Sequence, residues 1–397
     1  MMSLPIVIVG AGQAAARAIE TLHGLSCGRR IVLVGSEPHL PYQRPPLSKK
    51  FLTGDATEEQ LWLQGEAFLE KADVDFRRGE TALELDVTAR NVTLSGGETL
   101  AYHQLLIATG SQPRRLNLAG EELAGVHTLY SIADVQRLGA GLEDAQRVVI
   151  IGGGYIGLEV AASLIKLGKD VTVLEQQDRL LSRVVSPVLS DFFKQLHEGH
   201  GVTLRFNARA QRIEGDTDAT GVMLDDGSVI SADLVLVAAG AVANDQIARE
   251  AGLACDNGIF VDEACRVAPH VFAAGDCARF PSRRYGRHLR LESVQNANDQ
   301  ARAAATAMCG DEVRYDPVPW FWSDQYDVKL QIAGLSDGHD RVSVEGDPKA
   351  NSFAVSYWRG PQLLAVDAIN TPRAFMQARR TLQQPPSQST PSMAASG

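Results

Sequence analysis

The chain has 397 residues, enough for two or three domains of ordinary size. A hydrophobic fraction of 45% and a charged fraction of 22% are those of a globular protein, and no apolar run approaches the ~20 residues of a membrane-spanning helix. The net charge of −10 argues against nucleic-acid binding. No basic segment precedes the first apolar run, so we expect no secretion signal and a cytoplasmic location.

The first predicted unit starts near the N-terminus. An apolar run at 6–9 predicts a strand, the turn GAGQAA follows at 10–15, and a second apolar run at 31–34 leads to an acid. In a Rossmann unit the first glycine permits a tight turn, the second lets backbone approach a pyrophosphate, and the small third residue lets helix and strand pack closely. The acid, about 20 residues further on, accepts hydrogen bonds from a ribose. The candidate residues here are Gly10, Gly12, Ala15 and Glu37.

The second predicted unit repeats this order. An apolar run at 148–151 leads into GGGYIG at 152–157, and the run at 171–174 ends at an acid. Downstream, each unit also has a glycine turn followed by an apolar run that ends in glycine. One fingerprint is weak evidence, but two with matching acids and hairpins are strong, although tight strand–helix packing without a nucleotide stays an alternative. The candidate residues are Gly152, Gly154, Tyr155, Ile156, Gly157, Glu159, Glu175, Arg183 and Gly240.

An apolar strand at 271–274 ends in Gly-Asp, after the second unit. This arrangement resembles the FAD domain of flavoproteins with two dinucleotide sites, in which the chain returns to its first unit. The alternative for the aspartate is a cap on the following helix. The resemblance implies FAD in the first unit and NADH in the inserted one. We expect NADH rather than NADPH because the carboxylate of Glu175 repels a 2′-phosphate. Further FAD-side candidates are Ala108, Thr109, Gly110, Gly275 and Asp276.

The run PYQRPPLSK at 41–49 narrows the family, together with PWFWSDQ at 319–325. These runs closely resemble the oxygenase-coupled ferredoxin reductases, and the likeness extends to about residue 380. It implies an α/β fold of the glutathione reductase type, with two Rossmann-like dinucleotide-binding domains plus an α+β C-terminal domain. It also implies an FAD-dependent NADH:ferredoxin reductase that serves a [2Fe-2S] ferredoxin of a bacterial oxygenase system, either a Rieske dioxygenase or a cytochrome P450, in aromatic hydrocarbon catabolism. One departure from the family is the run AVAN at 241–244.

By the same likeness, Arg44 and Lys49 contact FAD, and Glu159 lies beside Lys49 near the flavin ring. An ammonium there can stabilise negative charge, so we predict Lys49 and Glu159 as the catalytic pair. The alternatives are a solvated loop lysine and a carboxylate that pairs with a helix dipole. Trp320 and Trp322 lie on one side of a predicted strand and could line the flavin or fill a core. Glu292 and Val294 complete the FAD-side candidates.

A basic run at 283–290 stands out on an acidic chain and is a candidate docking edge for an acidic ferredoxin, or only a solvated loop. The cysteines show no C-x-x-C spacing, so we predict reduced structural thiols at Cys27, Cys255, Cys265, Cys277 and Cys309. His197 and His200 lack a third ligand, so we predict a surface helix end and no metal site. The candidate docking residues are Arg283, Arg284, Arg287 and Arg290.

Two other functions fit the same cofactor motifs. A disulfide reductase or NADH oxidase would need a reactive cysteine near the flavin, and an NADH-sensing flavoprotein like apoptosis-inducing factor would need no acceptor. The expected domains are FAD-binding (1–113 and 244–317), NADH-binding (114–243) and a C-terminal interface domain (318–382). A disordered tail (383–397) is expected from its Pro, Ser, Gln and Ala content.

Overall fold

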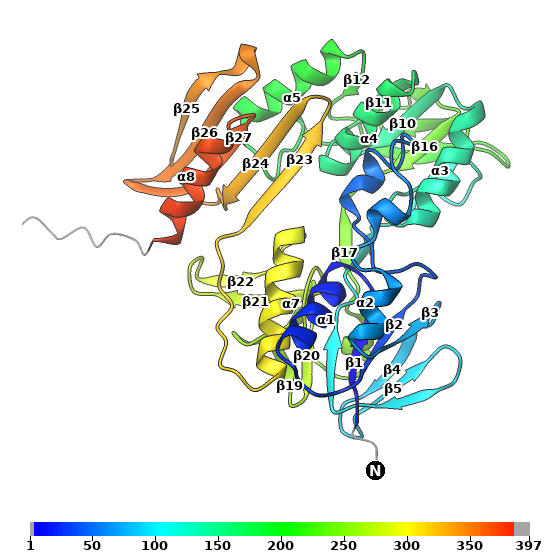
Figure 1. Cartoon of the computed structure of the whole chain (residues 1–397). Helices are drawn as coiled ribbons and strands as arrows, with labels where there is room; N and C mark the ends of the chain where they lie inside the picture. Colours follow the sequence, from blue (N-terminus) through cyan, green and yellow to red (C-terminus); the bar gives the residue numbers. More distant parts are fainter. Residues whose placement is uncertain (1–3, 385–397) are drawn as a thin grey trace, which may run out of the picture. The chain divides into compact units, whose positions relative to one another are not determined.

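The computed structural model describes residues 4–384, so the predicted disordered tail lies outside the described residues except for its first two positions. The chain forms two compact units, one of residues 1–182 and 190–316 and the other of residues 183–189 and 317–397 (Figure 1). Both predicted dinucleotide-binding domains fall in the first unit except for residues 183–189 and 317, and the predicted C-terminal domain falls in the second.

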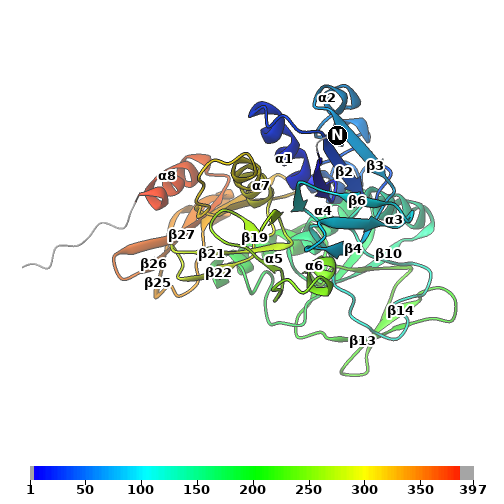
Figure 2. The ribbon, with the colours of Figure 1, turned by 90° about the horizontal axis from the view of Figure 1, so that it is seen from below.

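The first unit contains a six-stranded sheet in the order β19-β20-β7-β1-β2-β3. Only β19 runs antiparallel to its neighbour. The central strands are apolar throughout, as expected for a parallel sheet that is buried on both faces. The strands are β1 (Ile6–Val9), β2 (Ile31–Gly35), β3 (Val74–Arg78), β7 (Gln104–Ile107), β19 (Arg266–Ala268) and β20 (Val271–Ala273). Two helices, α1 (Gln13–Gly24) and α7 (Val294–Met308), lie side by side in Figures 1 and 2.

A parallel five-stranded sheet in the same unit has the order β12-β11-β10-β16-β9. Its order β16-β10-β11-β12 repeats β7-β1-β2-β3 of the first sheet, which confirms the predicted duplication. The strands are β9 (Val126–His127), β10 (Arg147–Ile151), β11 (Asp170–Leu174), β12 (Thr203–Arg205) and β16 (Leu234–Val237). The helices of this half are α3 (Ile132–Asp144), α4 (Tyr155–Lys166) and α5 (Pro187–Gly199).

Each half also carries a small antiparallel sheet between its strands, at the position that the glycine turns predicted. These sheets are β4 (Ala82–Asp86) with β5 (Asn91–Leu94) and β6 (Thr99–Ala101), and β13 (Ala210–Glu214) with β14 (Gly221–Leu224) and β15 (Val229–Ser231). A two-stranded ribbon joins the halves, formed by β8 (Ser111–Pro113) and β17 (Ala241–Ala243). The remaining elements of the first unit are η1 (Pro45–Ser48), η2 (Glu59–Leu61), α2 (Glu66–Lys71), α6 (Gln246–Glu250), β18 (Ile259–Phe260), β21 (Ala278–Ser282) and β22 (Arg287–Leu289).

The second unit is an antiparallel sheet in the order β23-β24-β27-β26-β25, with α8 packed on it, as an α+β domain should be. Its strands are β23 (Trp320–Gln325), β24 (Val328–Gly334), β25 (Arg341–Asp347), β26 (Ser352–Arg359) and β27 (Gln362–Ile369). The helical elements are η3 (Pro348–Ala350) and α8 (Pro372–Gln383). Residues 183–189 belong to this unit, where the backbone N–H of Ser186 donates to the Tyr357 hydroxyl at 3.1 Å.

Two predictions are wrong. Cys27 and Cys309 form a disulfide with a Cα–Cα distance of 5.7 Å, so they are not reduced thiols. Their pairing could not be read from spacing because 282 residues separate them. His197 is fully buried rather than exposed at a helix end. Within residues 4–384, no group of three or more His, Cys, Asp or Glu could hold a metal, and no helix is long and apolar enough to cross a membrane.

Candidate functional site

The first glycine of each fingerprint is required by sterics. Gly10 has φ +104°, and a Cβ there would lie 2.2 Å from the Ala108 carbonyl oxygen. Gly152 has φ +120°, and a Cβ there would lie 2.4 Å from the Ala238 carbonyl oxygen. Only glycine tolerates a positive φ together with a carbonyl oxygen this close to the Cβ position, so both turns run tightly against the neighbouring strand. The two turns are therefore built alike.

The second glycine of each fingerprint begins a helix and faces open space. Gly12 precedes α1 and Gly154 precedes α4, and neither helix has a side-chain cap at this end. A Cβ at either position would meet nothing within 4 Å. The first N–H groups of a helix lack intrahelical partners and attract anions. These two turns therefore fit the pyrophosphates of two dinucleotides.

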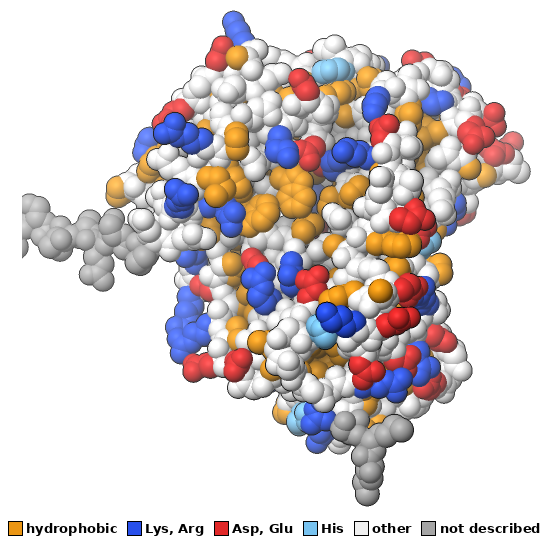
Figure 3. Space-filling view, viewed as in Figure 1, with side chains coloured by type: hydrophobic (Ala, Val, Ile, Leu, Met, Phe, Trp, Pro, Cys, Tyr) orange, Lys and Arg blue, Asp and Glu red, His pale blue; other side chains and the backbone are white. Residues whose placement is uncertain are grey.

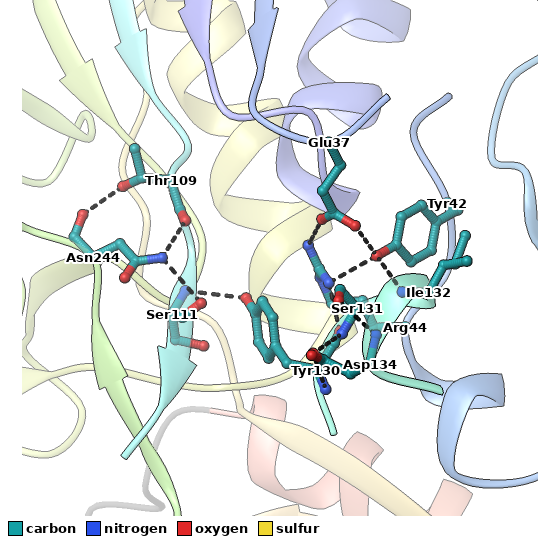
Figure 4. A network of polar contacts seen from close by, with 10 residues as sticks. All are labelled: Glu37, Tyr42, Arg44, Thr109, Ser111, Tyr130, Ser131, Ile132, Asp134 and Asn244. Carbon is teal, nitrogen blue, oxygen red and sulfur yellow. Dashed lines mark hydrogen bonds and ion pairs between the residues drawn. The ribbon is translucent and has the colours of Figure 1, made fainter. Parts of the chain in front are cut away.

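Glu37, the predicted ribose acceptor of the half with the six-stranded sheet, is the centre of a polar network (Figure 4). Glu37 Oε1 accepts from Arg44 Nη2 at 2.8 Å, and Glu37 Oε2 accepts from the Tyr42 hydroxyl at 2.6 Å. The same hydroxyl accepts from Arg44 Nη1 at 3.0 Å and from the backbone N–H of Ile132, the first residue of α3, at 3.3 Å. Burial is the main cause of a raised pKa of Tyr42, which therefore stays a protonated donor.

Arg44 extends this network toward Asp276. Its Nη1 donates to the Tyr130 carbonyl at 2.6 Å, and its guanidinium lies 4.1 Å from the centre of the Tyr130 ring. The Tyr130 hydroxyl accepts from the Ser111 N–H at 3.3 Å, and Ser111 Oγ donates to Asp276 Oδ2 at 2.9 Å. Figure 4 also shows Asn244 bridging the carbonyls of Thr109 and Ser111. One chain of contacts thus runs from Glu37 to Asp276, the two ends of the predicted FAD site.

Asp276 lies among donors that a bound cofactor could use. Burial, with the Glu292 charge, raises the pKa of its carboxyl to about 6, against the hydrogen bond from Ser111. Arg290 pairs with Glu292 at 2.7 Å and donates to the Asp276 carbonyl at 3.2 Å. Gln300 Oε1 accepts from the Gly275 N–H at 2.9 Å. Within residues 4–384, the buried Nε of Arg290 and Nε2 of Gln300 have no hydrogen-bond partner. Such donors fit an oxygen-rich ligand like the ribityl diphosphate of FAD.

The predicted catalytic pair meets between the two halves. Lys49 Nζ lies 2.5 Å from Glu159 Oε2, and Ser48 Oγ donates to the same oxygen at 2.6 Å. Glu159 is only 4% exposed and lies on α4, whereas Ser48 and Lys49 lie at the end of η1. Ser163, one turn further along α4, donates to the Ser48 carbonyl at 2.7 Å. Glu159 therefore pairs with the lysine, and a merely solvated Lys49 is ruled out.

On the NADH side, Glu175 is held by its own turn. Its Oε2 accepts from the Gly153 N–H at 2.9 Å and its Oε1 from the Gln177 N–H at 2.8 Å. Arg179, the nearest cation in sequence, donates to the Ser182 carbonyl and to Ser190 Oγ. A carboxylate directly after β11, with its neighbouring arginine bonded to Ser182 and Ser190, is an unfavourable place for a 2′-phosphate.

Except for Arg183, the other NADH-side candidates lie at the same edge of the second sheet. Tyr155 and the half-exposed Ile156 begin α4, and Gly240, with φ +91°, follows β16 and connects to the ribbon. Arg183 is exposed and belongs to the second unit. On the FAD side, Ala15 is buried on α1, the strand end 108–110 follows β7, and Val294 begins α7.

The two predicted flavin-lining tryptophans belong to the second unit. Trp320 and Trp322 lie on one side of β23, with ring centres 5.7 Å apart. Trp320 also contacts the Phe375 ring, and the Arg379 guanidinium lies 4.9 Å from its ring centre. Trp320 thus packs at least partly in the core of its own unit, as the alternative held. Their approach to the flavin stays a prediction.

Known proteins match this arrangement. A model of the pyridine nucleotide-disulphide oxidoreductases matches residues 4–301, and a model of the reductase C-terminal domain matches residues 320–395. The chain belongs to the pyridine nucleotide-disulphide oxidoreductase family. A relative, the 5,5′-dehydrodivanillate O-demethylase ferredoxin reductase subunit of Sphingobium sp. (strain NBRC 103272 / SYK-6), is 42% identical over 94% of this chain and 92% of its own.

Solved structures of ferredoxin reductases are similar over almost the whole chain. The ferredoxin reductase for the CYP199A2 system from Rhodopseudomonas palustris is 37% identical, with a TM-score of 0.92 over 94% of this chain and 93% of that one. The putidaredoxin reductase in a covalent complex with putidaredoxin is 38% identical, with a TM-score of 0.92 over 96% and 93%. The predicted family and fold are confirmed. The protein is an oxidoreductase of the ferredoxin reductase group, with FAD and a nicotinamide dinucleotide as cofactors.

Several residues of the site were not assigned a role from sequence. Tyr42 and Ser48 lie inside the run at 41–49, where only Arg44 and Lys49 were singled out. Ser111, Tyr130 and Gln300 lie in segments without a motif, so no local signal could have indicated them.

Proposed function

We propose that the protein is an NADH:ferredoxin reductase that delivers electrons to a [2Fe-2S] ferredoxin of a bacterial oxygenase system. The observation that carries the proposal is the buried contact of Lys49 and Ser48 with Glu159, which joins one dinucleotide unit to the other. The relatives' descriptions as ferredoxin reductases support the acceptor class. We also propose a cytoplasmic location.

The residues present fit FAD in the first half. The turn at Gly10–Gly12 and the donors beside Asp276 would hold its diphosphate and ribityl chain, and Glu37 would accept from its adenosine ribose. When bound, FAD supplies both hydride acceptance and one-electron donation. Lys49 then presents a positive charge to the region where negative charge develops, while Glu159 and Ser48 fix its position.

The role of Lys49 can be tested with an adjacent control. Lys49→Met should slow flavin reduction by NADH on the order of 10²-fold, because one preorganised charge is removed from the reacting region. Lys50→Met changes the exposed neighbour and should leave the rate at the wild-type value. Anaerobic stopped flow measures both. A wild-type rate in Lys49→Met would remove the proposed role.

NADH is the proposed donor because the Glu175 carboxylate, held by two backbone N–H groups, occupies the 2′ side of the adenosine ribose in our assignment. The wild type should show a higher kcat/KM with NADH than with NADPH, and Glu175→Ser should narrow the ratio by relieving repulsion of the 2′-phosphate. A wild-type kcat/KM that favours NADPH would contradict the assignment.

Docking of the ferredoxin is proposed at the hairpin of β21 and β22, which carries Arg283 and Arg284 in its turn and Arg287 at the start of β22. In Figure 3, Lys and Arg side chains lie where Figure 1 draws the hairpin of β21 and β22, and acidic side chains lie beside them. Arg283 is exposed but pairs with Glu263 at 2.6 Å. Arg290 is not part of this surface, because its side chain is 11% exposed and turned to Glu292. The proposed docking surface therefore does not include Arg290.

The double change Arg283→Glu with Arg284→Glu should raise the KM for ferredoxin and weaken its dependence on salt, because rim charges mainly steer association. Arg212→Glu, at an exposed arginine of β13, is the matched control. Unchanged KM and salt dependence in the double variant would show that this turn does not dock the acceptor.

Turnover tests the function itself. Cytochrome c reduction driven by NADH should be rapid with added [2Fe-2S] ferredoxin and slow without it. Fast oxygen consumption without ferredoxin would instead indicate an NADH oxidase. A long-lived complex of reduced flavin and NAD, with no transfer to any ferredoxin, would indicate an NADH-sensing flavoprotein.

A further inference from the structure

The disulfide Cys27–Cys309 lies at the far end of the two helices that frame the proposed FAD site. Cys27 follows α1, and Cys309 directly follows α7. These helices lie side by side, as both Figure 1 and Figure 2 show. Near their other ends, Gln13 Nε2 donates to Asn298 Oδ1 at 2.9 Å. The helix pair is thus fastened by a hydrogen bond near the cofactor and by a disulfide away from it.

The two cysteines are held in place by backbone rather than by the bond between them. The Cys27 N–H donates to the Leu22 carbonyl at 3.2 Å, after a residue with positive φ, Ser26. The Cys309 N–H donates to the Ala305 carbonyl at 3.1 Å, and Gly310 follows with φ +100°. Both sulfurs therefore stay near bonding distance when the bond is open, so closing it needs little ordering of the chain. Both residues are half-buried, so small reagents can reach them.

The disulfide lies at the opposite end of α1 from the fingerprint turn. α1 has 12 residues, so Cys27 is about 18 Å along the helix axis from the turn at Gly12. The disulfide therefore acts on the packing of α1 against α7, which carry the two sides of the proposed cofactor site at their N-terminal ends.

We propose that Cys27 and Cys309 are a reversible thiol–disulfide pair, closed by a peroxide and opened by a dithiol reductant, and that the closed form retains FAD more firmly. In closing, one cysteine thiolate attacks hydrogen peroxide, forming a sulfenic acid and releasing hydroxide. The second thiol displaces this oxygen as water and forms the S–S bond. In opening, a dithiol attacks one sulfur, and its second thiol completes the exchange, leaving two cysteine thiols and an oxidised reductant.

Closure depends on the proximity of the two thiols, which the backbone holds at the ends of α1 and α7. The other cysteines should not compete, because Cys265 and Cys277 are buried and burial raises their pKa. Cys255 is half-buried and also has a raised pKa, mainly through burial, so it is the matched control.

The experiment uses the full-length holoprotein in two forms, reduced with dithiothreitol and then oxidised with hydrogen peroxide. Thiol titration in denaturant should find five thiols in the reduced form and three in the oxidised form, and peptide mapping should find Cys27 linked to Cys309. Release of FAD on mild heating, followed by the rise in free flavin fluorescence, should be roughly tenfold slower in the oxidised form.

Variants separate this effect from general oxidation. Cys27→Ser and Cys309→Ser should each release FAD as fast as the reduced wild type, with or without peroxide. Cys255→Ser should keep the full difference between the two forms. Absence of the Cys27–Cys309 peptide after peroxide, or equal FAD release by the two wild-type forms, would overturn the proposal. Since this readout needs only bound FAD, it is independent of whether ferredoxin is the acceptor.

Discussion

One methyl group added at Gly157 should impair NADH binding and leave FAD binding unchanged. A Cβ at Gly157 would lie 2.1 Å from the Gly152 carbonyl oxygen and 3.4 Å from Ile150 Cγ2. The oxygen cannot move aside, because Gly152 is fixed by its N–H bond to the Leu174 carbonyl at 2.8 Å and pressed against the Ala238 carbonyl. In Gly157→Ala, therefore, α4 has to withdraw from the turn.

The size of this displacement sets the expected effect. Contacts of this kind are not found below 3.0 Å, so the two atoms have to separate by at least about 0.9 Å. Residues 157–164 of α4 are all buried, with Glu159 and Ala162 on the side away from Gly157, so the shift also compresses packed neighbours, at about 1–3 kcal/mol. A misplacement near 1 Å weakens productive binding on the order of 10²-fold. We expect a loss of that size in kcat/KM for NADH.

The assay compares FAD content, from the flavin absorbance per protein, with NADH-dependent flavin reduction. FAD content should stay at the wild-type level because the first fingerprint is untouched and already has an alanine, Ala15, at the equivalent position. Gly139→Ala is the control: it also lies in a helix of this half, and its Cβ would meet nothing within 4 Å. NADH kinetics within twofold of wild type in Gly157→Ala would refute the steric reasoning.

Three further changes test other parts of the structure. Tyr42→Phe removes the hydroxyl that fixes Glu37 and should speed FAD release several-fold in the fluorescence assay, with little change in NADH affinity. Ser48→Ala removes a 2.6 Å hydrogen bond to the buried Glu159 and should slow flavin reduction by roughly tenfold in stopped flow, whereas FAD content should not change. Burial raises the pKa of the Asp367 carboxyl from the ordinary 3.8 to about 7. Between these two pH values the folded protein keeps a proton that the unfolded chain has released, so stability is lost as the pH rises through this range. Asp367→Asn should therefore be stabilised relative to wild type increasingly between about pH 4 and about pH 7, with no further gain above that, as thermal melts would show; a constant difference would contradict the raised pKa.

The duplicated units could be predicted because each part of a fingerprint has a local physical cause. Gly10 and Gly152 are set by a positive φ and by a carbonyl that leaves no room for a Cβ. The strands before them are apolar because both faces of their sheets are buried. Such constraints fix one residue type at one position of a repeated strand–turn–helix unit, and they leave the same letters in both halves.

The contacts that assemble the site are of another kind. The Tyr42 hydroxyl meets Ile132, 90 residues away, and Ser111 meets Asp276, 165 residues away. A single hydroxyl imposes no period and no spacing on the sequence around it. Cys27 and Cys309 are separated further still, so their pairing, like these hydrogen bonds, follows only from the fold.

The segment that carries the family motif packs against the second sheet. Tyr42, Leu47, Leu52 and Leu61 belong by sequence to the half with the six-stranded sheet, yet their side chains are buried in one cluster with Val148, Ile150 and Leu236 of the second sheet. The segment is thus anchored in the core of the second half by its apolar side chains. Its polar side chains are turned elsewhere: Arg44 to Glu37, and Ser48 and Lys49 to Glu159.

The positions of Arg44 and Lys49 depend on the apolar core of the second half. Apolar burial is stronger than any one of these hydrogen bonds, so the core of the second half sets where Arg44 and Lys49 stand relative to both sites. A shift of that core would move Arg44, the predicted FAD contact, and Lys49 of the predicted catalytic pair together. Leu47 is 1% exposed, and Leu47→Ala should therefore impair FAD retention and flavin reduction together, in contrast to Gly157→Ala, which should affect only the NADH side. Loss of one property without the other in Leu47→Ala would show that the segment does not couple the two sites.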